Sequence, residues 1–527
     1  MRTSPLFSGR IEVFHKQFLE KFSNLEVIVL QNVGLLSLPV NSFEKCDELI
    51  QLDFHGNSLE MVSDRIFQNC RKITSLVLSS NNLRNLSNEA FAGLENLEIL
   101  NLNSNLIESF SQNWIKNLTK LKDLDFGKPL SNFTYESTML QHLKILEAIN
   151  LDSWNIKFEK IKNLIDKLTN LKIISISSNS LSDINYTFFN QFQTLKTLNL
   201  DNCSLSGIQP NVLKGFPKIK ELSFRHNQMK TIIKKTFEEL GSLEVLKLGH
   251  NIIDSVDTKS FDIHNQLKEL DLSNNKIKSL HADVFKFQTN LQRLDISSNG
   301  IETIAGLLKT LEKLEVVDFS NNAIKRLNSG LSGSLVLLKE LTASLNEIDE
   351  IPRNFFAHFP NLEKAKFEGN LCVDVSIDNF QQINLTSIFG QCFDNFEGLT
   401  TTTTTLPTTT AETSSTDGSQ TTTALTSTDL SITTTELTST DLISTTISTS
   451  TLKKTTTTIR ATTTATVRDT TTTTPYYVPS TQSTTLRTTT GRTTTDLQST
   501  TKGNGIGNIA GISSMVVVFC GLRILIL

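Results

Sequence analysis

The chain has 527 residues, a formal net charge of −4, and charged side chains at 20% of its positions. This balance, with no run of basic residues longer than two, excludes a nucleic-acid partner. Composition divides the chain into a region of regularly spaced leucines up to about residue 395, a threonine-rich region at 400–502, and an apolar end.

The pattern LxxLxLxxNxL recurs through the first region and is clearest at residues 267–277. Almost every interval is 24 residues, counted from Leu25. The first apolar residue of the pattern returns at Leu49, Ile73, Leu97, Leu121, Leu146, Leu171, Leu195, Ile219, Leu243, Leu267, Leu291, Leu314, Leu338 and Leu362. This period is typical of leucine-rich repeats, in which each turn buries its leucines by stacking on the next. It predicts an α/β solenoid: a leucine-rich repeat horseshoe with a parallel β-sheet on the concave face.

Two further columns share this phase. The ninth position is usually asparagine, whose amide can bond backbone groups that a bend leaves unpaired. This position holds Asn57, Asn81, Asn105, Asn179, Asn227, Asn251, Asn275, Asn299, Asn322, Asn346 and Asn370. A second column, expected to pack in the core on the convex side, holds Phe43, Phe67, Phe91, Phe189, Phe237, Phe261, Phe285 and Phe356.

The asparagine column is interrupted between Asn105 and Asn179, where Pro129 and Trp154 occupy it. The interruption predicts a local kink or bulge in the arc, and a contact loop is the alternative. Cys203 replaces asparagine in one further repeat. We expect this thiol to be buried and free rather than reactive.

Four of the six cysteines predict two disulfides of a secreted protein. Cys46 and Cys70 share one phase in adjacent repeats, and the spacing of neighbouring strands, about 5 Å, suits a disulfide. Cys372 and Cys392 bracket the end of the last repeat, where an apolar face needs a cap. Because no CxxC spacing supports zinc, we predict neither a metal site nor a cofactor.

The cysteines and the repeat phase also set the predicted boundaries. Repeats occupy residues 1–371, with a partial first repeat and about 15 more, and the cap occupies residues 372–395. Acceptor sequons for N-glycosylation begin at Asn85, Asn117, Asn132, Asn185, Asn202 and Asn384. Asn202 is the weakest of these candidates, because the next residue belongs to the interior ladder.

The region at 400–502 is dominated by threonine and serine, and has few residues that could build a core. Such a segment cannot offset the entropy of ordering its chain. We predict a disordered, O-glycosylated, mucin-like stalk. An unmodified flexible linker is the alternative.

Residues 503–527 predict attachment to a membrane. Small residues precede a spacer and an apolar run, as in a glycosylphosphatidylinositol (GPI) anchor signal. The candidate attachment residues are Gly503, Asn504 and Asn508. A transmembrane helix is the alternative, although it would contain Arg523 and would have no residues beyond the membrane.

The first 20 residues contain no apolar run of the kind that forms a signal peptide. Instead, the repeat phase extends back to Met1. We therefore expect a signal peptide and an N-terminal cap upstream, and a location on the outer leaflet of the plasma membrane. A cytosolic protein without a signal is the alternative, which the stalk, the tail and the paired cysteines disfavour.

The repeats, the end segment 369–372 with Cys392, and the tail together resemble insect lipid-anchored leucine-rich repeat surface proteins of the chaoptin and connectin kind. The repeats alone, about 75% of the chain, are equally similar to the extracellular repeats of Toll receptors and of the acid-labile subunit. The resemblance implies a lipid-anchored adhesion molecule. The chain departs from Toll receptors in having no cytoplasmic domain, and its cap has Cys372 where the usual form has two adjacent cysteines.

No catalytic motif occurs, so we do not expect an enzyme. The chain is predicted to be a surface recognition or adhesion protein without a signalling domain. Its expected ligand is an extracellular protein or glycan that binds on the concave face. A homodimer is a further candidate assembly. A defence or decoy receptor and a protective coat are the alternatives. The tentative ligand-binding residues segregate by charge along repeats nine to thirteen: Arg225, His226, Lys247, His250, Glu269, Asp271, Asp295 and Asp318. Asp271 and Asp295 are expected to face water.

Overall fold

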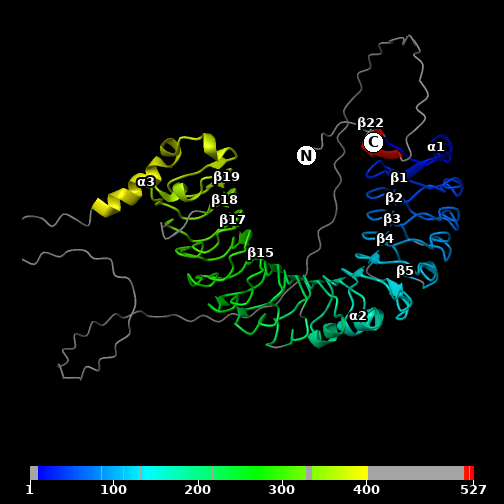
Figure 1. Ribbon diagram of the computed structural model, residues 1–527, viewed down its shortest axis with the longest axis horizontal. Helices are drawn as coiled ribbons and strands as arrows, with labels where there is room; N and C mark the ends of the chain where they lie inside the picture. The colour runs from blue at the N-terminus through cyan, green and yellow to red at the C-terminus, as the bar shows by residue number, and fades with distance from the viewer. Residues whose placement is uncertain are drawn as a thin grey trace, which may run out of the picture. The chain divides into compact units, whose positions relative to one another are not determined.

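A computed structural model describes residues 10–401, except 85, 111, 131, 132, 211, 217 and 328–334, together with residues 515–520 and 523–526. The described repeats form a curved solenoid, with one short strand of a parallel sheet in each turn (Figure 1). These strands are β1 (Leu25–Val29), β2 (Gln51–Asp53), β3 (Ser75–Val77), β4 (Ile99–Asn101), β6 (Asp123–Asp125), β8 (Ala148–Asn150), β9 (Ile173–Ser175), β10 (Thr197–Asn199), β11 (Glu221–Ser223), β13 (Val245–Lys247), β15 (Glu269–Asp271), β16 (Arg293–Asp295), β17 (Val316–Asp318), β18 (Glu340–Thr342) and β19 (Lys364–Lys366). The predicted horseshoe is confirmed.

The other elements are short. Two small parallel pairs lie outside the main sheet: β5 (Ser109–Phe110) with β7 (Thr134–Tyr135), and β12 (Thr231–Ile232) with β14 (Ser255–Val256). The helices are α1 (Gln17–Lys21), α2 (Phe158–Ile165), α3 (Leu385–Thr401) and the 3₁₀ turns η1 (Gln112–Trp114), η2 (Tyr186–Gln191), η3 (Phe355–His358) and η4 (Phe380–Gln382). Helix α2 lies on the outer side of the arc (Figure 1).

The leucine spacing produces the strands directly. In each three-residue strand of the main sheet the middle residue is buried and its two neighbours turn outward, as for Leu270 in β15. The register keeps equivalent residues side by side, so that Leu270 pairs with Leu246 on one side and with Leu294 on the other. The phenylalanine column is buried throughout, as predicted. One continuous apolar core therefore runs the length of the solenoid.

The asparagines form a second, polar column inside the core. Asn251 illustrates the pattern: its Nδ2 donates to the carbonyls of Phe224 (2.9 Å) and Leu248 (3.0 Å). Its Oδ1 accepts from the backbone nitrogen of Met229 at 3.0 Å. One side chain thus satisfies backbone groups in two adjacent turns, which a buried bend would otherwise leave unpaired.

Other hydrogen-bond donors replace asparagine at two positions of the asparagine column. Trp154 is buried, and its Nε1 donates to the carbonyl of Phe126 in the preceding turn at 2.7 Å. Cys203 is buried and free, and its Sγ donates to the carbonyl of Ile176 at 3.4 Å. Around Trp154, the rings of Phe126, Phe133 and Tyr135 pack edge-to-face or tilted, with centroids 5.0–5.6 Å from the indole. The irregular repeats are therefore part of the packed core.

Burial raises the pKa of the Cys203 thiol to about 12. At pH 8 only about one molecule in ten thousand would carry the thiolate, which is the reactive form. We expect iodoacetamide to leave Cys203 unmodified in the folded protein and to alkylate it fully in guanidinium chloride, as measured by peptide mass spectrometry. Alkylation of the folded protein at the rate of an exposed cysteine would contradict the buried placement.

Both predicted disulfides are present. Cys46 and Cys70 join adjacent turns with a Cα–Cα distance of 5.0 Å. Cys372 and Cys392 join the last turn to α3, with a Cα–Cα distance of 5.1 Å. Strand β20 (Ser376–Ile377) pairs antiparallel with β19 and covers the end of the sheet. Helix α3 continues to Thr401.

At the other end, β21 (Met515–Cys520) pairs in parallel with β1, and β22 (Arg523–Ile526) pairs antiparallel with β21. No helix in the described part of the chain is long and apolar enough to span a bilayer. The candidate anchor residues lie outside the described residues: Gly503, Asn504 and Asn508.

Candidate binding surface on the concave sheet

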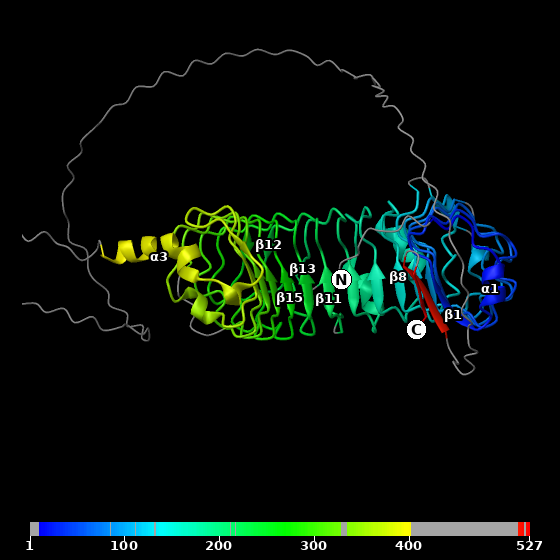
Figure 2. The same ribbon diagram turned by 90° about the horizontal axis from the view of Figure 1, so that it is seen from above.

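The strands of the main sheet lie along the inner face of the arc (Figure 2), so their outward side chains face into it. The register sets four of the predicted site residues in one row across neighbouring strands. Lys247 of β13 lies beside Asp271 of β15, which lies beside Asp295 of β16, and Asp318 of β17 follows. The structure therefore brings these side chains together on a single surface, as predicted.

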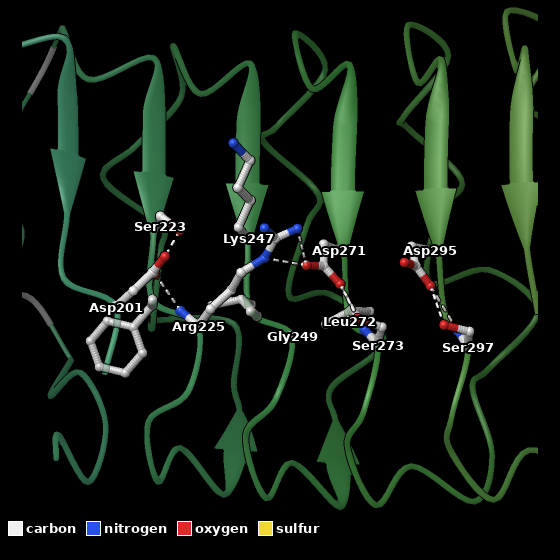
Figure 3. Close-up of polar contacts among 12 residues, drawn as sticks. Asp201, Ser223, Arg225, Lys247, Gly249, Asp271, Leu272, Ser273, Asp295 and Ser297 are labelled. Atoms are coloured by element: carbon white, nitrogen blue, oxygen red, sulfur yellow. Dashed lines mark hydrogen bonds and ion pairs between the residues drawn. The ribbon is translucent and has the colours of Figure 1, made fainter. Parts of the chain in front are cut away.

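Arg225 reaches this row from the turn after β11 (Figure 3). Its guanidinium contacts the Oδ2 atom of Asp271 through Nε at 2.6 Å and through Nη2 at 2.5 Å. The other carboxylate oxygen accepts from the backbone nitrogen and hydroxyl of Ser273, at 2.9 and 2.6 Å. The expectation that Asp271 faces water is wrong: only 4% of its side chain is exposed, because these groups enclose it.

The contact between Arg225 and Asp271 skips one whole turn of the solenoid. The skipped turn has Gly249 at the position that Arg225 and Ser273 occupy in the turns on either side. A Cβ atom at Gly249 would lie 2.8 Å from both carboxylate oxygens of Asp271 and from the hydroxyl of Ser273. The glycine therefore leaves the space through which the ion pair forms. The sequence prediction missed this role, although a glycine at a position of polar side chains was the available signal.

Asp295 and Asp318 have a different environment. Each accepts from a serine of its own turn: the hydroxyls of Ser297 and Ser320 lie 2.6 Å from the respective carboxylates. Burial, and to a smaller extent the neighbouring carboxylates, raise the pKa of Asp295. Within the described part of the chain, no cation forms an ion pair with either carboxylate. Both carboxylates therefore retain unused capacity for a positively charged group.

These carboxylates open into a hollow of about 230 Å³ on the sheet surface. Its polar lining comes from Arg225, Glu269, Asp271, Arg293, Asp295 and Asp318. Lys247 is not part of this lining, because it extends away from Asp271 and pairs with Glu221 at 2.8 Å (Figure 3). The hollow is therefore charged, and of its four carboxylates only Asp271 forms an ion pair within the described residues.

His226 and His250 lie at the rim of the same surface, in the turns after β11 and β13. Their rings stack with centroids 4.1 Å apart and planes 14° from parallel. Both side chains are exposed. Partial burial lowers the pKa of His250, and the neighbouring His226 lowers it further by a smaller amount. The pair borders the charged row without contributing to its ion pairs.

Of the sequons that the structure describes, only Asn202 borders this surface: its backbone nitrogen donates to the carbonyl of Arg225 at 2.8 Å. Asn117 and Asn185 lie in the segments between strands, Asn202 in a rim turn, and Asn384 just before α3, and all four are exposed. Asn85 and Asn132 lie outside the described residues. Between Lys220 and Glu340 the sequence contains no sequon.

Comparison with known proteins supports the repeat assignment. The Leucine rich repeat family matches residues 23–83, 71–127, 169–229, 193–253, 241–301 and 265–324. No curated protein matches the chain.

Several solved structures are similar to this chain. A leucine-rich repeat protein of Leptospira interrogans is 22% identical, with a TM-score of 0.54 over 68% of this chain and 88% of that chain. A TDR receptor is 21% identical, with a TM-score of 0.50 over 69% of this chain and 63% of that one. Toll, from the Drosophila Toll–Spatzle complex, is 21% identical, with a TM-score of 0.48 over 68% of this chain and 52% of its own. The repeated motif, the stacked parallel strands and the family matches together identify the chain as a leucine-rich repeat protein.

Proposed function

We propose that this protein recognises an extracellular ligand at the cell surface, and that the ligand places a positively charged group in the hollow beside Asp295 and Asp318. The observation that carries the proposal is the difference between these carboxylates and their neighbours. Asp271 is paired with Arg225, and Lys247 with Glu221, whereas Asp295 and Asp318 have only serine partners in the described structure. A cation from a ligand would offset the charge that burial makes unfavourable on Asp295.

Two further features support a ligand at this place. The surface is held by a regular sheet, so its groups are fixed before binding and little ordering is needed. The stretch between Lys220 and Glu340 lacks sequons, so no N-glycan attached in this stretch would cover the sheet. The threonine-rich stalk and a lipid anchor would hold the repeats away from the membrane, in an adhesion or recognition protein without enzymatic activity.

The proposal predicts that charge removal at the hollow weakens binding without unfolding the repeats. We expect the double variant Asp295→Asn and Asp318→Asn to lose affinity for its ligand by about tenfold or more, which corresponds to about 1.4 kcal/mol. The serine hydrogen bonds can be kept by the asparagine oxygen, so the thermal midpoint should not fall. Cells displaying the full chain would be screened by flow cytometry against a panel of extracellular proteins and glycans.

A charge-matched control separates this site from a general effect of charge. Glu239 and Glu302 are exposed and lie outside the concave row. Their replacement by glutamine removes the same two charges and should leave binding unchanged. Equal loss in both double variants would show non-specific attraction, and unchanged binding in the Asp295 and Asp318 variant would exclude this hollow as the site.

A further inference from the structure

A buried column at the back of the solenoid precedes each strand. Its position, 21 residues after the first apolar residue of a repeat, is occupied mainly by leucine and phenylalanine, and it also holds the Cys46–Cys70 disulfide. Leu240 and Phe216 are buried there. His264 follows Leu240 in this column and is fully buried, with 0% of its surface exposed. Because apolar residues fill this position in most other turns, packing of the core does not require a histidine here.

The hydrogen bonds of His264 define its protonation. Its Nε2 lies 3.1 Å from the carbonyl oxygen of Phe237, which can only accept, so Nε2 carries the proton in the neutral ring. The other nitrogen, Nδ1, is buried and has no hydrogen-bond partner in the described structure. A second proton would place a positive charge in the core, where burial disfavours it and only the backbone carbonyls of Phe237 and Phe261 favour it.

The surroundings of His264 offer nothing to neutralise that charge. The influences on its titration are burial and the backbone bonds with Phe237 and Phe261, and no charged side chain of the described residues is among them. Gln288 holds the same position in the next turn and donates its Nε2 to the carbonyl of Phe261 at 2.6 Å. A glutamine can thus supply the same donor without a titrating group.

The ring lies immediately before the strand that carries the concave site. The carbonyl of His264 accepts from the backbone nitrogen of Leu267 at 3.1 Å, two residues before β15 begins. Strand β15 presents Glu269 to the hollow and holds Asp271 in its ion pair with Arg225. Loosening the turn at His264 would therefore disturb the start of β15 and the carboxylates on it.

We propose that His264 is an acid-sensitive switch, whose protonation loosens the turn before β15 and weakens ligand binding at the concave surface in a mildly acidic compartment. The switch rests on the proposed function of that surface. His264 would regulate the site without contacting the ligand, because its ring lies in the core.

The direction of the pH effect follows from burial. Burial lowers the pKa of His264 below 6.5 in the folded protein, whereas the opened turn exposes an ordinary histidine. The stability associated with the neutral ring is therefore complete above about pH 6.5 and declines as the pH falls toward the folded pKa. For one proton, the local opening constant can rise at most about tenfold per pH unit in this window.

The first test is hydrogen exchange on the full chain without ligand, at pH 7.4 and 5.5. We expect protection factors in residues 261–275 to fall several-fold at pH 5.5 in the wild type, and to stay nearly constant in His264→Gln. His142 provides a matched control, because it sits in the same column and its Nε2 contacts the carbonyl of Ile115, but it is only partly buried. His142→Gln should keep the wild-type loss at residues 261–275.

The second test measures an arginine-rich peptide on the same three proteins at both pH values. The wild type should lose about three- to tenfold more affinity on acidification than His264→Gln does, and this difference isolates His264 from titration of Asp295. Equal protection at both pH values, or an equal loss of affinity in the two proteins, would overturn the switch. If His264→Gln does not fold, His264→Leu replaces it in both tests, because leucine occupies the equivalent position of the preceding turn, as Leu240. Failure of the peptide to bind at pH 7.4, with the exchange result intact, would refute the proposed ligand chemistry instead.

Discussion

Replacing Asn251 by alanine is expected to lower the free energy of unfolding by about 3–5 kcal/mol. The side chain is buried and bonds two carbonyls and one backbone nitrogen, in two adjacent turns. Alanine leaves the Phe224 carbonyl and the Met229 nitrogen without a partner, at about 1–3 kcal/mol each before relaxation, whereas the Leu248 carbonyl keeps a bond from Nδ2 of Asn275. Asn251→Asp should be at least as harmful, because a carboxylate cannot donate to the carbonyls of Phe224 and Leu248. Guanidinium denaturation followed by circular dichroism would measure both changes.

Asn41 provides the matched control for this experiment. Its side chain is exposed, and its backbone carbonyl, which alanine retains, accepts from Glu44. We expect Asn41→Ala to change the free energy of unfolding by less than about 0.5 kcal/mol. If the Asn251 and Asn41 variants unfolded at the same denaturant concentration, the internal asparagine column would not support the bends in the way that its hydrogen bonds indicate.

The fold could be predicted from the sequence because most contacts that define the solenoid join equivalent positions of adjacent turns. In most turns the leucines, phenylalanines and asparagines stack on their own kind about 24 residues later, and Cys46 and Cys70 obey the same rule. Trp154 was harder, because its indole reaches the carbonyl of Phe126 by extending across an irregular turn. The periodic pattern marks such a position only as an interruption.

The candidate site was predictable only in part. The row from Lys247 to Asp318 follows from strand register, but the burial of Asp271 depends on a partner two turns away. If only contacts between adjacent turns are considered, Asp271 is expected to face solvent, like most residues at the equivalent position of other strands. The combination of Arg225, Gly249 and Ser273 at one position of three successive turns changes that environment. Its effect depends on side-chain reach, which the spacing of leucines does not specify.

The second large effect is expected at the ion pair between Arg225 and Asp271. Removal of one partner of a buried pair costs about 3–5 kcal/mol, and we expect about 3 kcal/mol for Asp271→Ala. The lower value applies because the Arg225 side chain is 37% exposed and can turn toward water. Arg225→Ala leaves the carboxylate enclosed beside Asp295, so its effect should be similar or larger. A double-mutant cycle would give a coupling energy of about 1–3 kcal/mol, and additive effects of the two changes would contradict a direct pair.

Gly249→Ala tests the same contact without removing either charge. A new Cβ 2.8 Å from the Asp271 oxygens and the Ser273 hydroxyl must displace groups that hydrogen bonds hold in place, at about 1–3 kcal/mol. Gly300→Ala is the control, because its Cβ would meet nothing nearer than 3.7 Å. Once Asp271 is alanine the carboxylate is gone, and the Ser273 hydroxyl can rotate away. Gly249→Ala should then cost little, so that the double variant is about as stable as Asp271→Ala alone. A full additional loss in the double variant would mean that Gly249 is required for another reason, such as its backbone conformation, rather than for the space that the ion pair occupies.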